Sequence, residues 1–542
     1  MTRKNALLSV YHKDGIVDFA QALVELGWTI YASGGTAKAL IDKGVPVTVV
    51  STLVGGEAIL NHRVVTLSRE VHAGLLACDC DIAELESLGI PWLDLVCVDL
   101  YPLEAEIARP GSTPESIIEK TDIGGPTMLR SAAKGRRIVI SDPGDRDLVI
   151  SWLRGKASIS EDELRETLAA KAEFVVAHYA LTSAAQISSD GYFGFLGQKV
   201  EDCKYGENPW QTPAALYSNR PDDPLSLEKF EVLEGTDRSF INWTDVDRLL
   251  QTMTHIAAGC DLNCGEVPQI ALGAKHGNCC GASVVTHNNC RGGETALKCM
   301  LDGDLRAIFG GSVMVNFTVD EIVAETLMTW EMEGDKRRIL DLVVAPAFTI
   351  MAIEILKRRG DKCRLLVNPA LAMLDRNSLD TAIRFRYVRG GFLTQPNYFF
   401  VLDLEDPDIQ RFEGRSLPSQ IRSLNVVLAW AIGSTSNSNT ITLVNNGMLI
   451  ANGTGQQDRA SCCELAGMKA DLAGLETKGA VAYSDSFFPF TDGPETLALA
   501  EIALILATSG SVNDQLIKDK CQELGIALLM IPDKKGRGFY GH

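Results

Sequence analysis

The stretch AKHGNCCG at residues 274–281 follows the apolar run Ile270–Leu272 and ends in small residues. An apolar run that leads into a turn is typical of a buried strand. A lysine and a histidine therefore stand side by side where this strand is expected to end. Burial disfavours an ammonium and moves an imidazole towards its neutral form, so Lys275-His276 would set a base beside a cation. Acyl transfer to a weak amine needs that pair. A surface Lys-His pair explains the dipeptide about equally well.

The composition excludes several classes of protein. A chain of 542 residues is too long for one core, so we expect at least two domains. The net charge of −19 argues against a nucleic-acid or anionic-membrane partner. No apolar run is long enough to span a bilayer, and no secretion signal is present. Fourteen cysteines without such a signal favour reduced thiols and a cytoplasmic location.

A cluster of cysteines raises the question of zinc. The spacing is irregular and has no paired C-x-x-C elements, which favours buried free thiols over a metal site. We therefore expect no metal. The cluster comprises Cys260, Cys264, Cys279, Cys280, Cys290 and Cys299, with His276 and His287 nearby.

The first 150 residues alternate strand and helix patterns, which predicts a doubly wound α/β sheet. Residues 15–26 have the apolar spacing of a helix. The expected strands are Ala6–Val10, Trp28–Ala32, Val47–Val50, Leu95–Leu100 and Arg137–Ser141.

Two turns in this region are suited to anions. The turn Ser33-Gly34-Gly35-Thr36 leads from a strand into a helix, where free N–H groups and the helix dipole can hold a phosphate. The turn TDIGGPT at residues 121–127 precedes a helix with Arg130 and Lys134 on one face. Together they indicate a phosphorylated small molecule at the strand ends. A capped helix and a solvated basic face are the alternatives.

A helical stretch at 160–185 and a glycine- and aromatic-rich stretch at 191–197 mark a domain boundary, giving domains 1–196 and 197–542. The second domain again mixes helices and strands. Its expected strands include Leu340–Val344, Tyr398–Leu402 and Thr440–Val444. No internal repeat is evident in the sequence.

The ordered set of motifs resembles the bifunctional AICAR transformylase/IMP cyclohydrolase family along nearly the whole chain. The cyclohydrolase half is matched by ALLSV (6–10), SGGT (33–36), DLYP (99–102), DIGG (122–125) and AAK (132–134). The transformylase half is matched by KYGENPWQ (204–211), residues 275–281, FGG (309–311), Ser438-Asn439, residues 453–459 and SDSFFPFTDG (484–493).

The resemblance implies a methylglyoxal-synthase-like doubly wound N-terminal domain and a larger C-terminal α/β domain, cytidine-deaminase-like but without zinc. It implies formyl transfer from 10-formyltetrahydrofolate, a co-substrate, to the amine of AICAR, and closure of formyl-AICAR to IMP. Family members are homodimers with the transformylase site at the subunit interface.

The resemblance also assigns residues. It implies catalytic roles for Lys275, His276 and Asn439 in formyl transfer, and for Tyr101, Asp122 and Lys134 in ring closure. The substrate-binding residues that it implies are Ser9, Lys13, Ser33, Gly34, Gly35, Thr36, Arg63, Thr66, Gly124, Gly125, Lys204, Tyr205, Asn242, Gly310, Gly311, Gln456, Arg459 and Asp492.

The chain departs from the family pattern at several positions. Val65 stands where the family has a lysine, and Arg69 could return that charge. Lys204, Trp210 and Asp458 also differ from the usual residues. These departures leave two alternatives open, a transformylase with a degenerate cyclohydrolase domain and a paralogue that formylates another amine.

Overall fold

The computed structural model describes residues 4–60, 63–188, 191–286, 292–360, 362–413 and 419–541. Within this part the chain forms two compact units, Met1–Leu196 and Gly197–His542. His287 and Cys290, which belong to the cysteine cluster and its neighbouring histidines in the sequence, lie outside the described residues.

The first unit is built on a parallel sheet in the order β3-β2-β1-β4-β5. Its strands are β1 (Asn5–Ser9), β2 (Thr29–Ala32), β3 (Thr48–Val49), β4 (Leu95–Val98) and β5 (Ile138–Ile140). The chain goes from β1 to β2 on one side and returns to β4 on the other, so the strand order reverses beside β1. Ligands of open α/β sheets bind in the crevice at such a reversal. The predicted doubly wound sheet is confirmed.

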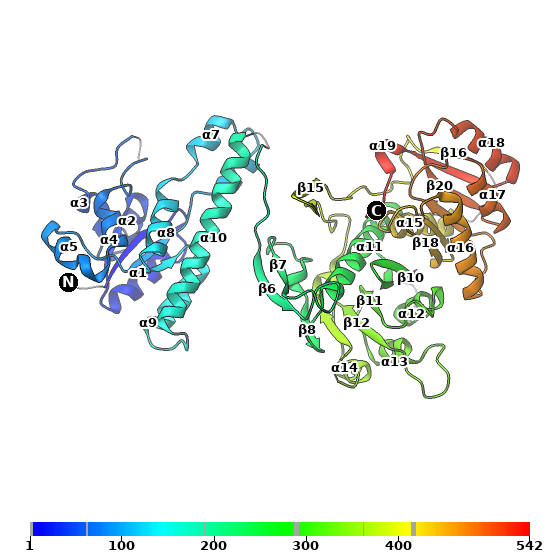
Figure 1. The fold of residues 1–542 in the computed structure, drawn as a ribbon, viewed down its shortest axis with the longest axis horizontal. Coiled ribbons are helices and arrows are strands. Elements are labelled where there is room, and N and C mark those ends of the chain that lie inside the picture. Colours follow the sequence, from blue (N-terminus) through cyan, green and yellow to red (C-terminus); the bar gives the residue numbers. More distant parts are fainter. Residues whose placement is uncertain are drawn as a thin grey trace. The chain divides into compact units, whose positions relative to one another are not determined.

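Helices cover this sheet, and α10 runs along the unit as its longest helix (Figure 1). The helices are α1 (Ile16–Glu25), α2 (Gly34–Ile41), α3 (Val50–Leu53), α4 (Arg69–Leu76), α5 (Ile82–Leu88), α6 (Leu103–Ala108), α7 (Pro114–Glu119), α8 (Gly124–Lys134), α9 (Arg146–Leu153) and α10 (Glu161–Ser188).

The second unit contains a mixed sheet in the order β16-β21-β20-β19-β17-β18-β10-β9-β11-β12-β13-β8. Its strands are β8 (Glu231–Glu234), β9 (Gln269–Lys275), β10 (Asn278–Val285), β11 (Gly311–Val315), β12 (Leu340–Ala345), β13 (Arg364–Val367), β16 (Gln410–Phe412), β17 (Ile441–Asn445), β18 (Met448–Gly453), β19 (Val481–Ser484), β20 (Leu504–Ser509) and β21 (Ala527–Pro532). Two hairpins form separate sheets, β6 (Gln198–Cys203) with β7 (Ala214–Ser218) and β14 (Ile383–Val388) with β15 (Gly391–Pro396).

The helices of this unit are α11 (Phe240–Cys264), α12 (Gly292–Gly303), α13 (Glu321–Thr329), α14 (Ile350–Leu356), α15 (Ser419–Ser434), α16 (Arg459–Ala473), α17 (Asp492–Leu499), α18 (Asp514–Leu524) and α19 (Asp533–Gly536). Short 3₁₀ segments complete the two units at Asp79–Asp81, Pro143–Asp145, Leu227–Lys229 and Pro369–Met373.

The second unit contains a structural repeat that the sequence did not reveal. The series α11-β9-β10-α12-β11-α13-β12-α14-β13 recurs as α15-β17-β18-α16-β19-α17-β20-α18-β21. The strand orders match as well, since β10-β9-β11-β12-β13 corresponds to β18-β17-β19-β20-β21, and β10 pairs with β18 at the centre. The repeat therefore belongs to the fold and is not evident in the sequence.

The two halves even share a hairpin turn. His276 and Gly277 have φ of 54° and 71°, and Asn446 and Gly447 have φ of 49° and 71°. Two consecutive residues with positive φ form a tight two-residue turn, whose twist matches that of the two strands it connects. Lys275 is thus the last residue of β9, and His276 is the first residue of the turn.

One predicted strand is absent. The apolar stretch Tyr398–Leu402 packs against the core but forms no strand in the described structure. Side chains from α11 bind two of its carbonyl groups instead, since Gln251 Nε2 donates to Tyr398 O at 3.2 Å and Asn263 Nδ2 donates to Leu402 O at 2.7 Å. An apolar run alone does not show which groups will pair with its backbone.

Candidate functional site

A cavity of about 1180 Å³ opens in the first unit where the sheet order reverses. Its walls come from the ends of β1, β2 and β4 and from the starts of α2 and α8. Most of the residues expected there line it, namely Ser9, Lys13, Ser33, Gly34, Gly35, Thr36, Arg63, Thr66, Tyr101, Asp122, Gly124 and Gly125.

One end of the cavity is suited to a phosphate. The helix α2 begins there with Gly34 and Gly35, so its first N–H groups face the cavity without side chains in front of them. The hydroxyls of Ser9 and Ser33 lie 2.8 Å apart beside this turn. Lys13 is close to Gly35, and partial burial lowers the pKa of its ammonium while Asp99 raises it.

The other end carries Tyr101 and Asp122. Gly125 N donates to Asp122 Oδ1 at 2.9 Å, and burial raises the pKa of this carboxyl. Burial and the nearby Asp122 also raise the pKa of Tyr101. Gly125 has no room for a side chain, because a Cβ there would lie 2.4 Å from Asp122 Oδ2. The glycine is needed for this close approach.

Arg63 and Lys134 are placed differently from the other residues expected in this cavity. Arg63 lines the cavity, but its guanidinium is paired with Glu119. Lys134 is exposed at the C-terminal end of α8, about 15 Å along the helix axis from Gly124, and it is not among the cavity-lining residues. Its catalytic role stays a prediction.

The charge missing at Val65 is not restored by Arg69. Val65 lines the cavity, whereas Arg69 lies outside it, 76% exposed, with Glu70 as its ion-pair partner. Lys120 was not predicted from the sequence, but it lines the cavity and has its ammonium 5.7 Å from the ring centre of Tyr11. Tyr11 in turn packs edge-on to Tyr101 at 5.5 Å.

In the second unit, the β9–β10 turn carries Lys275 and His276. Lys275 Nζ donates to Phe309 O at 2.5 Å, beside Gly310 and Gly311. His276, however, is exposed rather than buried. It occupies the tip of a hairpin instead of the buried strand end that the sequence led us to expect.

The loop between α15 and β17 brings Asn439 towards this turn. Asn437 N donates to Asn278 Oδ1 at 3.2 Å, which joins the loop to β10. The Asn439 side chain is fixed at both ends, since Nδ2 donates to Gln456 O at 2.8 Å and Oδ1 accepts from Arg459 at 2.7 Å. An amide nitrogen has two hydrogens, so one remains for a ligand.

Two aspartates that were not predicted support these loops. Asp485 is fully buried and pairs with Arg459 at 2.5 Å, and it accepts a hydrogen bond from Ser438. Asp245 on α11 accepts from Gly277 N at 3.3 Å and from Ser312 Oγ at 2.8 Å. Burial raises the pKa of Asp245, and the charge of His276 lowers it. Asp485 belongs to the motif at 484–493, but nothing in the sequence distinguishes it from the other residues of that motif.

The remaining expected residues are spread more widely. Lys204 and Tyr205 run beside residues 238–240, where Tyr205 O accepts from Phe240 N at 3.0 Å. Asn242 caps α11 through Ser239, one turn before Asp245. Asp492 is exposed at the start of α17 and accepts from Gly493 N.

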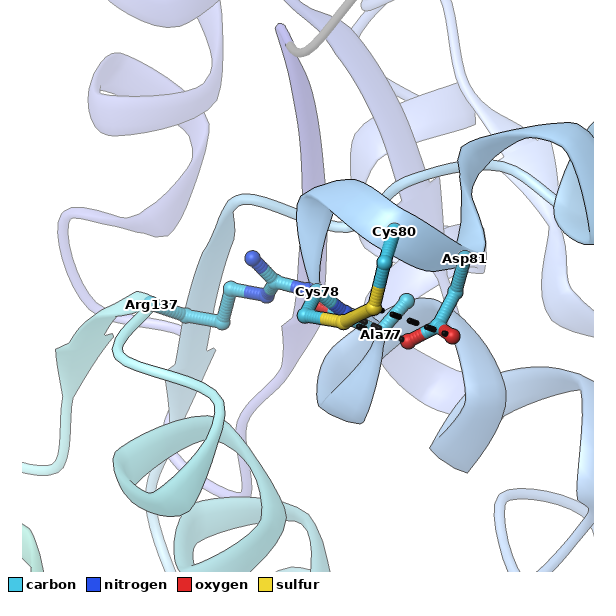
Figure 2. Close-up of a disulfide and its surroundings, with 5 residues drawn as sticks. All are labelled: Ala77, Cys78, Cys80, Asp81 and Arg137. Carbon is cyan, nitrogen blue, oxygen red and sulfur yellow. Dashed lines mark hydrogen bonds between the residues drawn. A yellow bond between two sulfur atoms is a disulfide. The ribbon is translucent and has the colours of Figure 1, made fainter.

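The thiols are mostly free and buried, as expected, with one exception. Cys78 and Cys80 form a disulfide next to Asp81, on the surface of the first unit (Figure 2). The expectation that all thiols are reduced is therefore wrong at this pair, whose C-x-C spacing was not considered. Within the described residues, these three are also the one group whose ligand atoms come close enough for a metal, and the cysteines near Cys279 form no such group.

Comparisons with known proteins cover nearly the whole chain. A family model described as AICARFT/IMPCHase bienzyme matches residues 132–469, and one described as an MGS-like domain matches residues 15–127. The chain is 34% identical to the bifunctional purine biosynthesis protein PurH of Anoxybacillus flavithermus, over 97% of this chain and 98% of the relative. It is 33% identical to proteins of the same name from Neisseria meningitidis, over 97% and 98%, and Neisseria gonorrhoeae, over 97% of each chain.

A solved structure titled "Crystal structure of ForH" aligns with 34% of this chain and all of that chain, at 35% identity and a TM-score of 0.30. In the described part of the chain, no helix is long and apolar enough to cross a membrane. The family match spans more than half of the residues, and the relatives align almost from end to end. This chain therefore belongs to the AICARFT/IMPCHase bienzyme family, with an MGS-like domain in its first unit.

Proposed function

We propose that this protein catalyses the last two steps of IMP synthesis, formyl transfer to AICAR in the second unit and ring closure in the first. The observation that carries the proposal is the end-to-end match to bifunctional relatives. The cavity-lining residues of the first unit and the joined loops of the second support the assignment of one reaction to each unit.

In formyl transfer, the amine nitrogen of AICAR bonds to the formyl carbon of 10-formyltetrahydrofolate, and the bond from that carbon to the folate nitrogen breaks. The amine is a weak nucleophile, so a base must take its proton as the new bond forms. His276 is our candidate for this base. Lys275 and the free N–H of Asn439 are suited to stabilising the oxyanion of the tetrahedral intermediate.

In ring closure, the carboxamide nitrogen of formyl-AICAR attacks the formyl carbon, and water then leaves. The substrate phosphate would bind at the start of α2, where N–H groups and Lys13 supply positive potential. Tyr101 and Asp122 would move protons at the other end, where both have raised pKa values. Lys120 offers the positive charge that Val65 lacks.

We further propose that the protein is a cytoplasmic homodimer. The β14–β15 hairpin stands apart from the large sheet of its unit (Figure 1), and an isolated hairpin is only marginally stable in water. Its exposed side chains include Ile383, Phe385, Tyr387, Phe392 and Leu393. A second copy that covers this surface would bury them and could also shield His276. Sedimentation of the protein at micromolar concentration tests this, and a monomer would contradict it.

Two variants test the division of the reactions between the units. His276→Gln should abolish formyl transfer to AICAR and leave the cyclisation of pre-made formyl-AICAR unchanged. Tyr101→Phe should slow cyclisation and leave formyl transfer unchanged. Loss of both reactions in a folded variant would contradict the assignment.

A further inference from the structure

Arg248 connects the two loops that carry the candidate catalytic groups of the second unit. From α11, its Nε donates to Gly277 O at 2.8 Å and its Nη2 donates to Asn437 Oδ1 at 2.6 Å. Gly277 follows His276, and Asn437 lies two residues before Asn439. One planar guanidinium therefore binds both loops and sets the distance between the candidate base His276 and the amide of Asn439.

The C-terminal segment holds this guanidinium. The guanidinium carbons of Arg248 and Arg384 lie 3.8 Å and 3.7 Å from the centre of the Tyr540 ring. Tyr540 Oη donates to Asp247 Oδ2 at 2.6 Å, and Tyr540 N donates to Ser436 O at 2.9 Å. Arg248 is 8% exposed, and burial lowers its pKa to about 10, so it stays charged at neutral pH.

The structural repeat provides an internal comparison. In the β17–β18 turn, Gly447 N donates to Asn425 Oδ1 at 2.8 Å, just as Gly277 N donates to Asp245 Oδ1 in the β9–β10 turn. Three residues beyond Asn425, in the place of Arg248, stands the buried Leu428. The same turn thus forms without a guanidinium, so forming the hairpin does not require Arg248.

We propose that Arg248, oriented by Tyr540, is a positioning residue for formyl transfer, which fixes the turn of His276 relative to the loop of Asn439. The inference rests on the proposed function of the second unit. It follows that removing the guanidinium leaves the turn folded but lets the two loops shift, and a shift of 1 Å at a reacting centre can cost about 100-fold in rate.

The first test is Arg248→Lys, which keeps the charge but loses the fork that binds both loops. We expect kcat for formyl transfer to fall about 10- to 100-fold, with a smaller change in the KM for AICAR and unchanged cyclisation of formyl-AICAR. Arg137→Lys is the matched control. Arg137 also packs on an aromatic ring, Trp92 at 3.8 Å, and donates to carbonyls, but it does so in the first unit beside Ala77 (Figure 2).

The control should lose thermal stability and keep its kcat for formyl transfer. The inference is overturned if Arg248→Lys has a normal kcat. It is also overturned if the loss of kcat is no larger than the fraction of protein that is unfolded. A wild-type enzyme without formyl transfer overturns the proposed function instead.

A second readout separates positioning from folding. Guanidinium ion at millimolar concentration should restore part of the kcat of Arg248→Ala and none of the activity of His276→Gln. Tyr540→Phe, which keeps the ring and loses only the bond to Asp247, should lower kcat by about 3- to 10-fold. Absence of rescue in a folded Arg248→Ala enzyme, together with normal kcat in Tyr540→Phe, contradicts the proposal.

Discussion

The pair of Arg459 and Asp485 allows a prediction that separates stability from activity. Both side chains are buried, with exposures of 10% and 0%, and the two charges lie 2.5 Å apart. Arg459 also donates to Asn439 Oδ1, and Asp485 accepts from Ser438 beside it. Asp485→Asn keeps the size of the side chain but leaves the charge of Arg459 without its partner.

Removing one partner of a buried ion pair costs about 3–5 kcal/mol, because the remaining charge is desolvated without compensation. A unit of about 350 residues has an unfolding entropy of roughly 0.7 kcal/mol/K. The melting temperature of the second unit should therefore fall by about 4–7 °C. The first unit has its own core and should melt as before.

The double variant Arg459→Met with Asp485→Asn removes both charges. Replacing a buried pair by neutral groups is often close to neutral for stability, so we expect most of the lost melting temperature to return. The kcat for formyl transfer should be low in the double variant, since Asn439 has lost the donor that fixes its Oδ1. Calorimetry and a formyl-transfer assay on the two single variants and the double variant check this. Normal melting of Asp485→Asn, or a normal kcat in the double variant, would refute the reasoning.

Three further predictions concern ring closure. Lys120→Met should slow the cyclisation of formyl-AICAR about 10-fold or more by removing a cation near Tyr101, and an unchanged rate would show that this charge is not used. Gly125→Ala should reduce cyclisation and cost about 1–3 kcal/mol of stability, because its Cβ would lie 2.4 Å from Asp122 Oδ2 and 2.7 Å from Leu100 Cδ2; a normal melting curve contradicts this. We propose that the charged form of Asp122 accepts the proton in cyclisation. Because burial raises the pKa of this carboxyl, kcat/KM for cyclisation should fall as the pH drops, starting above the usual range of an aspartate near about pH 4. A kcat/KM for cyclisation that stays constant down to about pH 4 would contradict this prediction.

The sequence was a good guide to the first unit for a physical reason. In a parallel sheet, the turns after successive strands meet at one edge, so the turn Ser33 to Thr36 after β2 was expected at the strand ends and lies there. Asp122 to Gly125 follow α7 rather than a strand, and the start of α8 brings them to the same cavity. Lys120 was missed because a lysine before a turn has no distinctive spacing. Its position becomes clear only from Tyr11, which is far away in the chain.

The second unit was harder to predict because its site is assembled from distant segments. Asp245, Arg248 and Asp485 act through the backbone of other loops, and no local motif announces such contacts. The exposure of His276 was indicated only indirectly by the sequence. Asn-Gly between two apolar runs is a hairpin signal, and it occurs at Asn446-Gly447, whereas at His276-Gly277 a histidine stands in place of the asparagine.

The central claim is that one chain carries both reactions. The most direct test supplies the purified protein with AICAR and 10-formyltetrahydrofolate and resolves formyl-AICAR and IMP by chromatography over the time course. We predict that IMP is the main product and that formyl-AICAR appears only as a transient. Formyl-AICAR that accumulates without IMP would contradict a working cyclohydrolase, and the absence of both products would contradict the account as a whole.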